Sequence, residues 1–167
     1  MAGIIINLIE TMKEQISLYE ILLESTKEKK RAVIENNIDL INKLNDDDNI
    51  TVGRIMKLDK KREELFRDIA FVLNKEMKGI TITKIIEYIK GQPEEEEVTR
   101  LKEKMTSLLS EINDLNEKNK KLIGYAIEQI DFSMNLVRST LSNEPSYYDT
   151  MGNEILSDNK RLFDAKQ

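Results

Sequence analysis

The sequence predicts an all-α protein, an elongated antiparallel helical bundle or coiled coil of three long helices with a short connector helix and a mobile C-terminal tail. Turn-forming residues are scarce, because 167 residues include only 6 glycines and 2 prolines. That is too few for the many tight turns of a β-sandwich or barrel. Long stretches also repeat apolar residues at a 4-3-4-3 spacing, the pattern of helices that pack along their length. We expect the bundle over residues 1–143 and a flexible tail over 144–167.

The first helix is expected over residues 3–35. No proline or glycine interrupts the chain from Ile4 to Ile34, and at 1.5 Å per residue this stretch is about 45 Å long. The Asn36-Asn37 pair should end the helix, because Asn tolerates a left-handed conformation and favours turns. The apolar seam of this helix consists of Ile5, Ile9, Met12, Ile16, Tyr19, Leu23, Thr26, Lys30 and Val33.

The second helix is expected over residues 38–78. Two polar residues, Asp48 and Thr51, fall on its seam, and Gly53 lies close by. The sequence therefore leaves open whether this helix is broken at 46–49. Gly79 is expected to end it as a C-cap residue.

A short connector helix over 83–90 and a last helix over 94–142 complete the bundle. Gly91 and Pro93 separate the two, since proline cannot continue a helix but suits its first turn. Four glutamates at 94–97 then start the last helix, where the helix macrodipole stabilises negative charge. Because adjacent helical positions point in different directions, these carboxylates are not expected to bind a metal ion.

The last helix carries two apolar faces. Its seam is expected to be bundle core throughout, with a register-setting Asn within it; the seam residues are Leu101, Met105, Leu108, Ile112, Leu115, Asn119, Ile123, Ile127, Ile130, Met134, Val137 and Leu141. A second face, about 135° away at 100° per residue, changes from charged to apolar halfway along. Its apolar part, here called the second face, is Leu122, Tyr125, Gln129, Phe132 and Leu136.

A helix that is apolar on two sides must bury both. The sequence leaves two explanations for the second face. The protein's own first two helices could cover both sides of the last one. Alternatively, the second face binds an amphipathic helix of another molecule, with the aromatic side chains of Tyr125 and Phe132 as anchors.

Composition excludes several classes of function. The net charge is −5, and no basic face is available to displace counterions from nucleic acid. The absence of Cys and His removes disulfides, thiolate metal sites and the usual general base. Since no phosphate-binding glycine loop occurs either, we expect no enzyme, no metal and no cofactor. No apolar run approaches the roughly 20 residues of a membrane span, and the N-terminus lacks a basic signal region. A cytoplasmic protein that is not an integral membrane protein is expected.

Two runs in the last helix carry a family resemblance. Residues 115–123 read LNEKNKKLI and residues 126–137 read AIEQIDFSMNLV, and Tyr148-Asp149 and Gly152 follow. These strings, and the order of long, long, short and long helices, resemble the FlgN family of flagellar type III export chaperones. The chain differs in having Asn36-Asn37 where members often show a Gly-Asp type break.

The resemblance implies a function and partners. A chaperone of this family binds the C-terminal amphipathic helical segments of the flagellar hook-associated, or hook–filament junction, proteins and prevents their premature association. It then delivers them to the export gate, so that export-gate and export-ATPase components are further partners. The resemblance places the substrate surface on the second half of the last helix, where the second face lies. It also implicates a tyrosine in docking to the gate, for which Tyr147 and Tyr148 are the candidates.

A structural role is the alternative to a chaperone. The same apolar second face could make the chain a coiled-coil scaffold that forms a homodimer through Tyr125 and Phe132. The spacing of the residues does not decide between these two hypotheses.

Overall fold

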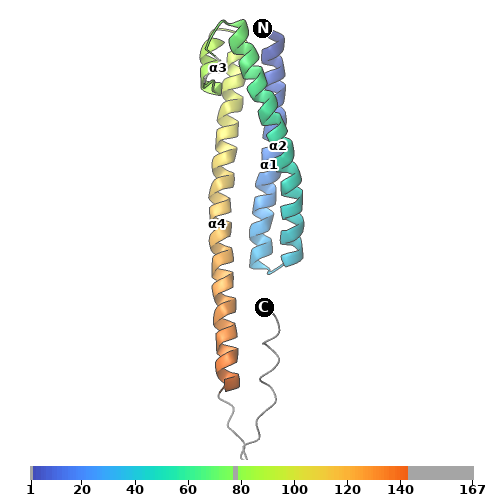
Figure 1. Ribbon diagram of the computed structural model, residues 1–167, viewed down its shortest axis with the longest axis vertical. Coiled ribbons are helices and arrows are strands. Elements are labelled where there is room, and N and C mark those ends of the chain that lie inside the picture. Colours follow the sequence, from blue (N-terminus) through green and yellow to red (C-terminus); the bar gives the residue numbers. More distant parts are fainter. Residues whose placement is uncertain (1, 77–78, 143–167) are drawn as a thin grey trace, which may run out of the picture. The chain divides into compact units, whose positions relative to one another are not determined.

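A computed structural model describes residues 2–76 and 79–142, and the predicted tail over 144–167 lies outside them. The described residues form four helices and no strand: α1 (Ala2–Ile34), α2 (Ile38–Val72), α3 (Ile82–Tyr88) and α4 (Glu95–Ser142), shown in Figure 1. The all-α prediction is therefore confirmed. The chain divides into two compact units, Met1–Gly124 and Tyr125–Gln167. Helix α4 contributes its first thirty residues to the first unit and the rest to the second.

The turn between α1 and α2 is built by the two asparagines. Asn36 has a left-handed backbone with φ 53°. The Asn37 N–H donates to Ala32 O at 2.9 Å and the Asn36 N–H to Val33 O at 3.2 Å, which together form a Schellman motif. The Asn37 side chain then accepts the Leu40 N–H at 3.1 Å as the N-cap of α2. One dipeptide thus ends one helix and begins the next.

Helix α2 continues without a break through 46–53. The charged seam residue Asp48 pairs with Lys29 of α1 at 2.7 Å, with only 18% and 19% of the two side chains exposed. Thr51 donates its hydroxyl to Asp47 O at 3.0 Å. Because the carboxylate on the seam has a cationic partner across the interface, it does not disrupt the helix.

The predicted end of this helix is wrong. Helix α2 ends at Val72 and not at residue 78. Asn74 has φ 53°, the Lys75 N–H donates to Ala70 O at 2.8 Å and the Asn74 N–H to Phe71 O at 3.1 Å. This is a second Schellman motif with Asn in the left-handed position. Gly79, the expected C-cap residue, has φ +67° and lies beyond the helix, in the turn before α3.

The first unit is an up-down-up bundle. Contacts between α1 and α2 run in opposite senses along the two helices, since Gln15 pairs with Asp59 and Lys29 with Asp48. Contacts between α1 and α4 run in the same sense along the two helices, because residue numbers increase together in three ion pairs that join them. Helix α2 is therefore antiparallel to both. All four helices supply the core, whose completely buried apolar residues are Ile5, Leu8, Ala32, Ile69, Ala70, Ile85, Ile89 and Val98.

Candidate interaction surface

The proximal half of α4, residues 95–119, is a core helix. Leu101 and Met105 are buried in the cluster shared with α1, α2 and α3, and so are Val98 and Ile112. Leu108 and Leu115 are partly buried and pack against the same cluster. The seam prediction is confirmed for this half of the helix.

Ion pairs fix the register of α4 against α1. Lys13 pairs with Glu97 at 2.9 Å, Glu20 with Lys104 at 2.6 Å, and Lys27 with Glu111 at 3.7 Å. Partners on each helix are thus spaced by seven residues, two turns, and lie on one side of each helix. These exposed pairs align the two helices more than they stabilise them.

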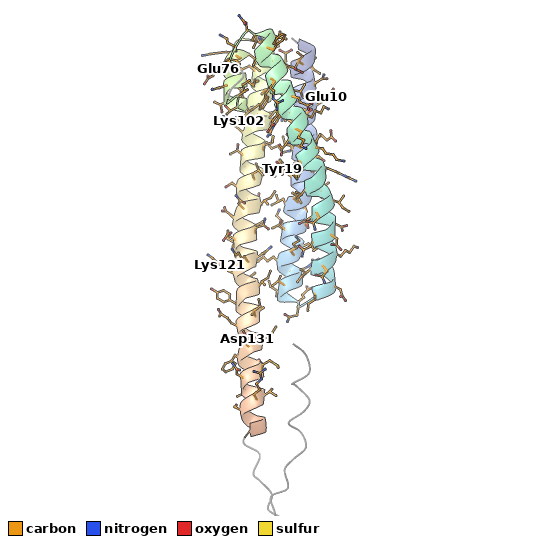
Figure 2. All side chains as sticks on the ribbon, in the orientation of Figure 1. Glu10, Tyr19, Glu76, Lys102, Lys121 and Asp131 are labelled. Atoms are coloured by element: carbon orange, nitrogen blue, oxygen red, sulfur yellow. The ribbon has the colours of Figure 1, made fainter. Side chains whose placement is uncertain are left out.

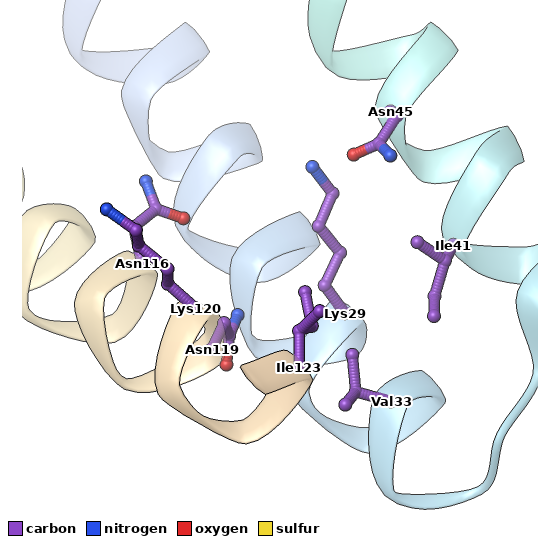
Figure 3. Close-up of a pocket in the computed structure, with 8 residues that line it drawn as sticks. All are labelled: Lys29, Val33, Ile41, Asn45, Asn116, Asn119, Lys120 and Ile123. Carbon is purple, nitrogen blue, oxygen red and sulfur yellow. The ribbon is translucent and has the colours of Figure 1, made fainter. Parts of the chain in front are cut away.

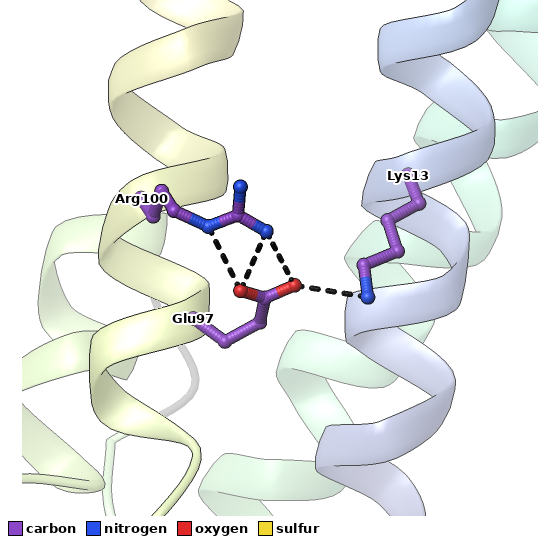
Figure 4. A network of polar contacts seen from close by, with 3 residues as sticks. All are labelled: Lys13, Glu97 and Arg100. Atoms are coloured by element: carbon purple, nitrogen blue, oxygen red, sulfur yellow. Dashed lines mark hydrogen bonds and ion pairs between the residues drawn. The ribbon is translucent and has the colours of Figure 1, made fainter.

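Glu97 is the centre of the first of these contacts. Figure 4 shows its carboxylate between Lys13 of α1 and the guanidinium of Arg100, which donates from Nε and Nη2 at 2.7 to 2.9 Å. The hydrogen bonds from Lys13 and then Arg100 lower the pKa of Glu97. Nearby, Glu95 accepts the Gly91 N–H at 2.6 Å. Two of the four glutamates therefore have structural partners. In the described ranges no group of three or more acidic residues could hold a metal ion.

Asn119 is the last buried residue of α4 among those up to 139, whose side chains the structure describes. Only 6% of it is exposed, its Nδ2 donates to the main-chain oxygen of Thr26 at 2.9 Å, and its Oδ1 has no partner. This is the seam asparagine that the sequence assigned to setting register. Because this side chain donates to one carbonyl group of α1, a shift of α4 by one helical turn would break the hydrogen bond.

A cavity of about 270 Å³ adjoins Asn119 in the first unit (Figure 3). Its walls come from the last turns of α1, the first turns of α2 and the middle of α4. The lining residues are Lys29, Val33, Ile41, Asn45, Asn116, Asn119, Lys120 and Ile123. Because Val33 and Ile41 flank the α1–α2 turn, the tip of this hairpin and Ile123 of α4 line the same cavity.

The distal half of α4, residues 123–142, is not a core helix. The distal part of the seam, here called the seam stripe, is 42% to 62% exposed, so the prediction that the seam is core along its whole length is wrong. Helix α1 has 33 residues and α4 has 48. The seam stripe consists of Ile123, Ile127, Ile130, Met134 and Val137; the side chain of Leu141, also predicted as core, lies outside the described residues.

The second face is exposed as well. Tyr125, Phe132 and Leu136 are 63%, 68% and 55% exposed, Gln129 is exposed and Leu122 is half-buried. The first explanation for this face, burial by the protein's own helices, fails for the three large side chains. Figure 2 shows side chains projecting to both sides of α4 around Asp131.

Sequence reasoning found one exposed apolar face and missed the other. The seam stripe continues the core seam through three successive steps of four between Leu115 and Ile127, so periodicity alone assigns it to the core. The signal that could have separated it was the difference in predicted lengths between the first and last helices. Tyr147 and Tyr148, the predicted gate-docking residues, lie outside the described residues.

The geometry defines a class of protein: a helical bundle whose longest helix ends in an exposed apolar stretch suited to binding other helices. None of the helices in the described ranges is both long and apolar enough for a membrane span. A family model described as FlgN protein matches residues 1–154, and the chain belongs to the FlgN family. Membership gives it the general role of a flagellar export chaperone that binds flagellar proteins, in a family not known for catalysis. No curated protein and no solved structure matches the chain.

Proposed function

We propose that this chain is a cytoplasmic chaperone for the hook-associated proteins, whose C-terminal amphipathic helical segments bind the second face of α4. Binding keeps these segments from associating prematurely until they reach the export gate. The observation that carries the proposal is the exposure of Tyr125, Phe132 and Leu136. These residues lie in the part of α4 where the sequence resembles the family most closely.

The chemistry of the second face suits reversible capture. Two aromatic rings and two leucines offer apolar anchors of the kind that concentrate binding energy, and an amphipathic helix can match them at i, i+3, i+4 and i+7 spacing. The face lies on one exposed helix and not in a deep pocket. Release at the gate then depends on the dissociation rate, through which affinity is mostly adjusted.

A double substitution tests the proposal. Phe132→Ser with Leu136→Ser should abolish capture of the C-terminal segments of hook-associated proteins, measured by calorimetry, and leave the helical signal in circular dichroism nearly unchanged. Phe71→Ser with Ile50→Ser is the matched control, because these apolar residues of α2 are 76% and 59% exposed and lie outside the second face. Undiminished capture by the first variant, or equal loss in both, would contradict the proposal.

The alternative is a homodimeric scaffold that uses the same face. The mass of the free protein in solution discriminates the two, because a tight homodimer that dissociates on Phe132→Ser substitution favours the scaffold. A monomer that captures hook-associated segments favours the chaperone.

Delivery to the export gate forms a separate part of the proposal. Tyr147 or Tyr148 would dock on export-gate components, with the export ATPase as a further partner. We expect Tyr147→Ala with Tyr148→Ala to retain capture of the hook-associated segments and to reduce their secretion. Normal secretion by this variant would exclude the two tyrosines from docking.

A further inference from the structure

The charged residues of distal α4 all lie in one sector of the helix. At 100° per residue, Glu128, Asp131 and Arg138 fall within about 80° of arc, together with Asn135. The seam stripe and the second face together span about 220° of the remaining circumference. Between these two faces lie only small side chains, Ala126 and Ser133, and the Ser133 hydroxyl donates to Gln129 O of its own helix at 2.9 Å.

One neighbouring helix cannot cover this apolar sector. The stripe that a helix buries against one packed partner is about 100° wide, which is less than half of what distal α4 exposes. Self-association does not solve the problem either. A two-fold dimer formed through this stretch brings one helix to each copy and leaves the other face in water.

We propose that a hook-associated protein binds distal α4 from two sides, with one amphipathic helical segment on the seam stripe and another on the second face. This inference rests on the proposed function and specifies its partner. The distal half of α4 then becomes one member of an intermolecular assembly of three helices, with its charged sector facing water.

Charge adds a feature to one of the two segments. The exposed side chains of Lys118 and Lys121 lie at the proximal end of the second face, where Lys118 continues the line of Leu122. An acidic residue at the matching end of the segment on this face complements them, which speeds encounter and fixes direction more than it adds affinity.

The absence of cysteine from the chain allows a direct test by site-specific photo-crosslinking. Ile130→Cys and Phe132→Cys place a label on the seam stripe and on the second face, about 160° apart around the helix. Asp131→Cys, in the charged sector, is the matched control. Each variant of the full chain carries a benzophenone maleimide and is irradiated with a full-length hook-associated protein, and the crosslinked peptides are identified by mass spectrometry.

We expect labels at 130 and 132 to crosslink to two different segments of the hook-associated protein, with little product from 131. Crosslinks from both positions to one segment, or from 132 alone, would overturn the two-sided mode while leaving the chaperone function intact. Crosslinks from 130 to a second copy of this chain would also overturn it. No crosslink to the hook-associated protein from any position contradicts the proposed function itself.

Affinity provides a second measurement that does not depend on labelling. Ile127→Ser with Ile130→Ser should weaken binding of the full-length hook-associated protein by about tenfold or more, as truncated interface anchors do. The residues are 54% and 62% exposed, so the variant retains its fold. If this variant keeps its affinity and the Phe132→Ser, Leu136→Ser variant loses it, a single helical segment binds, on the second face, and the two-sided mode is overturned.

Discussion

The two halves of α4 have the same periodicity and different surroundings. In the proximal half the seam residues Leu101 and Met105 are 3% and 7% exposed, whereas in the distal half Ile130 is 62% exposed. Both halves repeat steps of four and three residues, and three successive steps of four join them between Leu115 and Ile127. The comparison teaches that periodicity identifies which side of a helix needs a partner, and that periodicity alone does not decide whether the chain itself supplies one.

Amide hydrogen exchange should reveal the largest difference between the halves. A solvated helix of about 12–15 residues or fewer is marginal on its own, so amides at 125–139 should exchange after local opening that costs little free energy. Amides at 98–119 should exchange only on global unfolding, which costs about 5–15 kcal/mol in ordinary domains. Strong and uniform protection of both stretches in the free protein would remove the distinction.

A matched pair of isoleucines sharpens the comparison. Ile112→Ala in the proximal seam should lower the free energy of unfolding by about 2–5 kcal/mol, because it leaves a cavity in a buried cluster. Ile130→Ala in the seam stripe should change it by less than about 0.5 kcal/mol, as surface substitutions do. Urea denaturation of the two variants measures both values. An equal loss would mean that the seam stripe is buried in the free protein.

Much of the fold could be predicted from the sequence, because local signals determine it. Seam periodicity and the Asn36-Asn37 pair indicate the helices and the first turn. The end of α2 could not be predicted, since the sequence offers both Asn74 and Gly79 as left-handed residues and only the Schellman hydrogen bonds select Asn74. The continuity of α2 through Asp48 could not be predicted either, because it depends on Lys29, distant in sequence.

Of the two exposed apolar faces of distal α4, only the second face could be predicted from the sequence. The second face could be recognised because its residue types change from charged to apolar halfway along α4. The seam stripe has no such change of residue type, and its spacing does not say whether Ile127 and Ile130 are core. That is a property of packing between helices and not of α4 itself.

Two asparagines mark the boundary between the halves. Asn119→Ala removes a buried hydrogen bond to Thr26 O and the packing of its side chain, and should cost about 1–2 kcal/mol of unfolding free energy. Asn135→Ala, at an exposed position of the distal half, should be neutral or slightly stabilising because Ala has the higher helix propensity. Thermal unfolding of both variants provides the measurement. A neutral Asn119→Ala would show that the hydrogen bond does not hold the register.

The smallest expected effect concerns charge at the start of the proximal half. Lys13 and Arg100 lower the pKa of Glu97 below its ordinary value of 4.5, so the folded protein favours the carboxylate more than the unfolded chain does. The stabilisation is therefore present above the unfolded pKa and is lost as the pH falls through the lower, folded value. In Glu97→Gln the free energy of unfolding should fall slightly less steeply as the pH is lowered into the acid range. The substitution should have no effect on this pH dependence at higher salt, because the carboxylate is near the surface. An unchanged pH dependence of unfolding in Glu97→Gln at low salt would show that Lys13 and Arg100 do not stabilise the folded carboxylate.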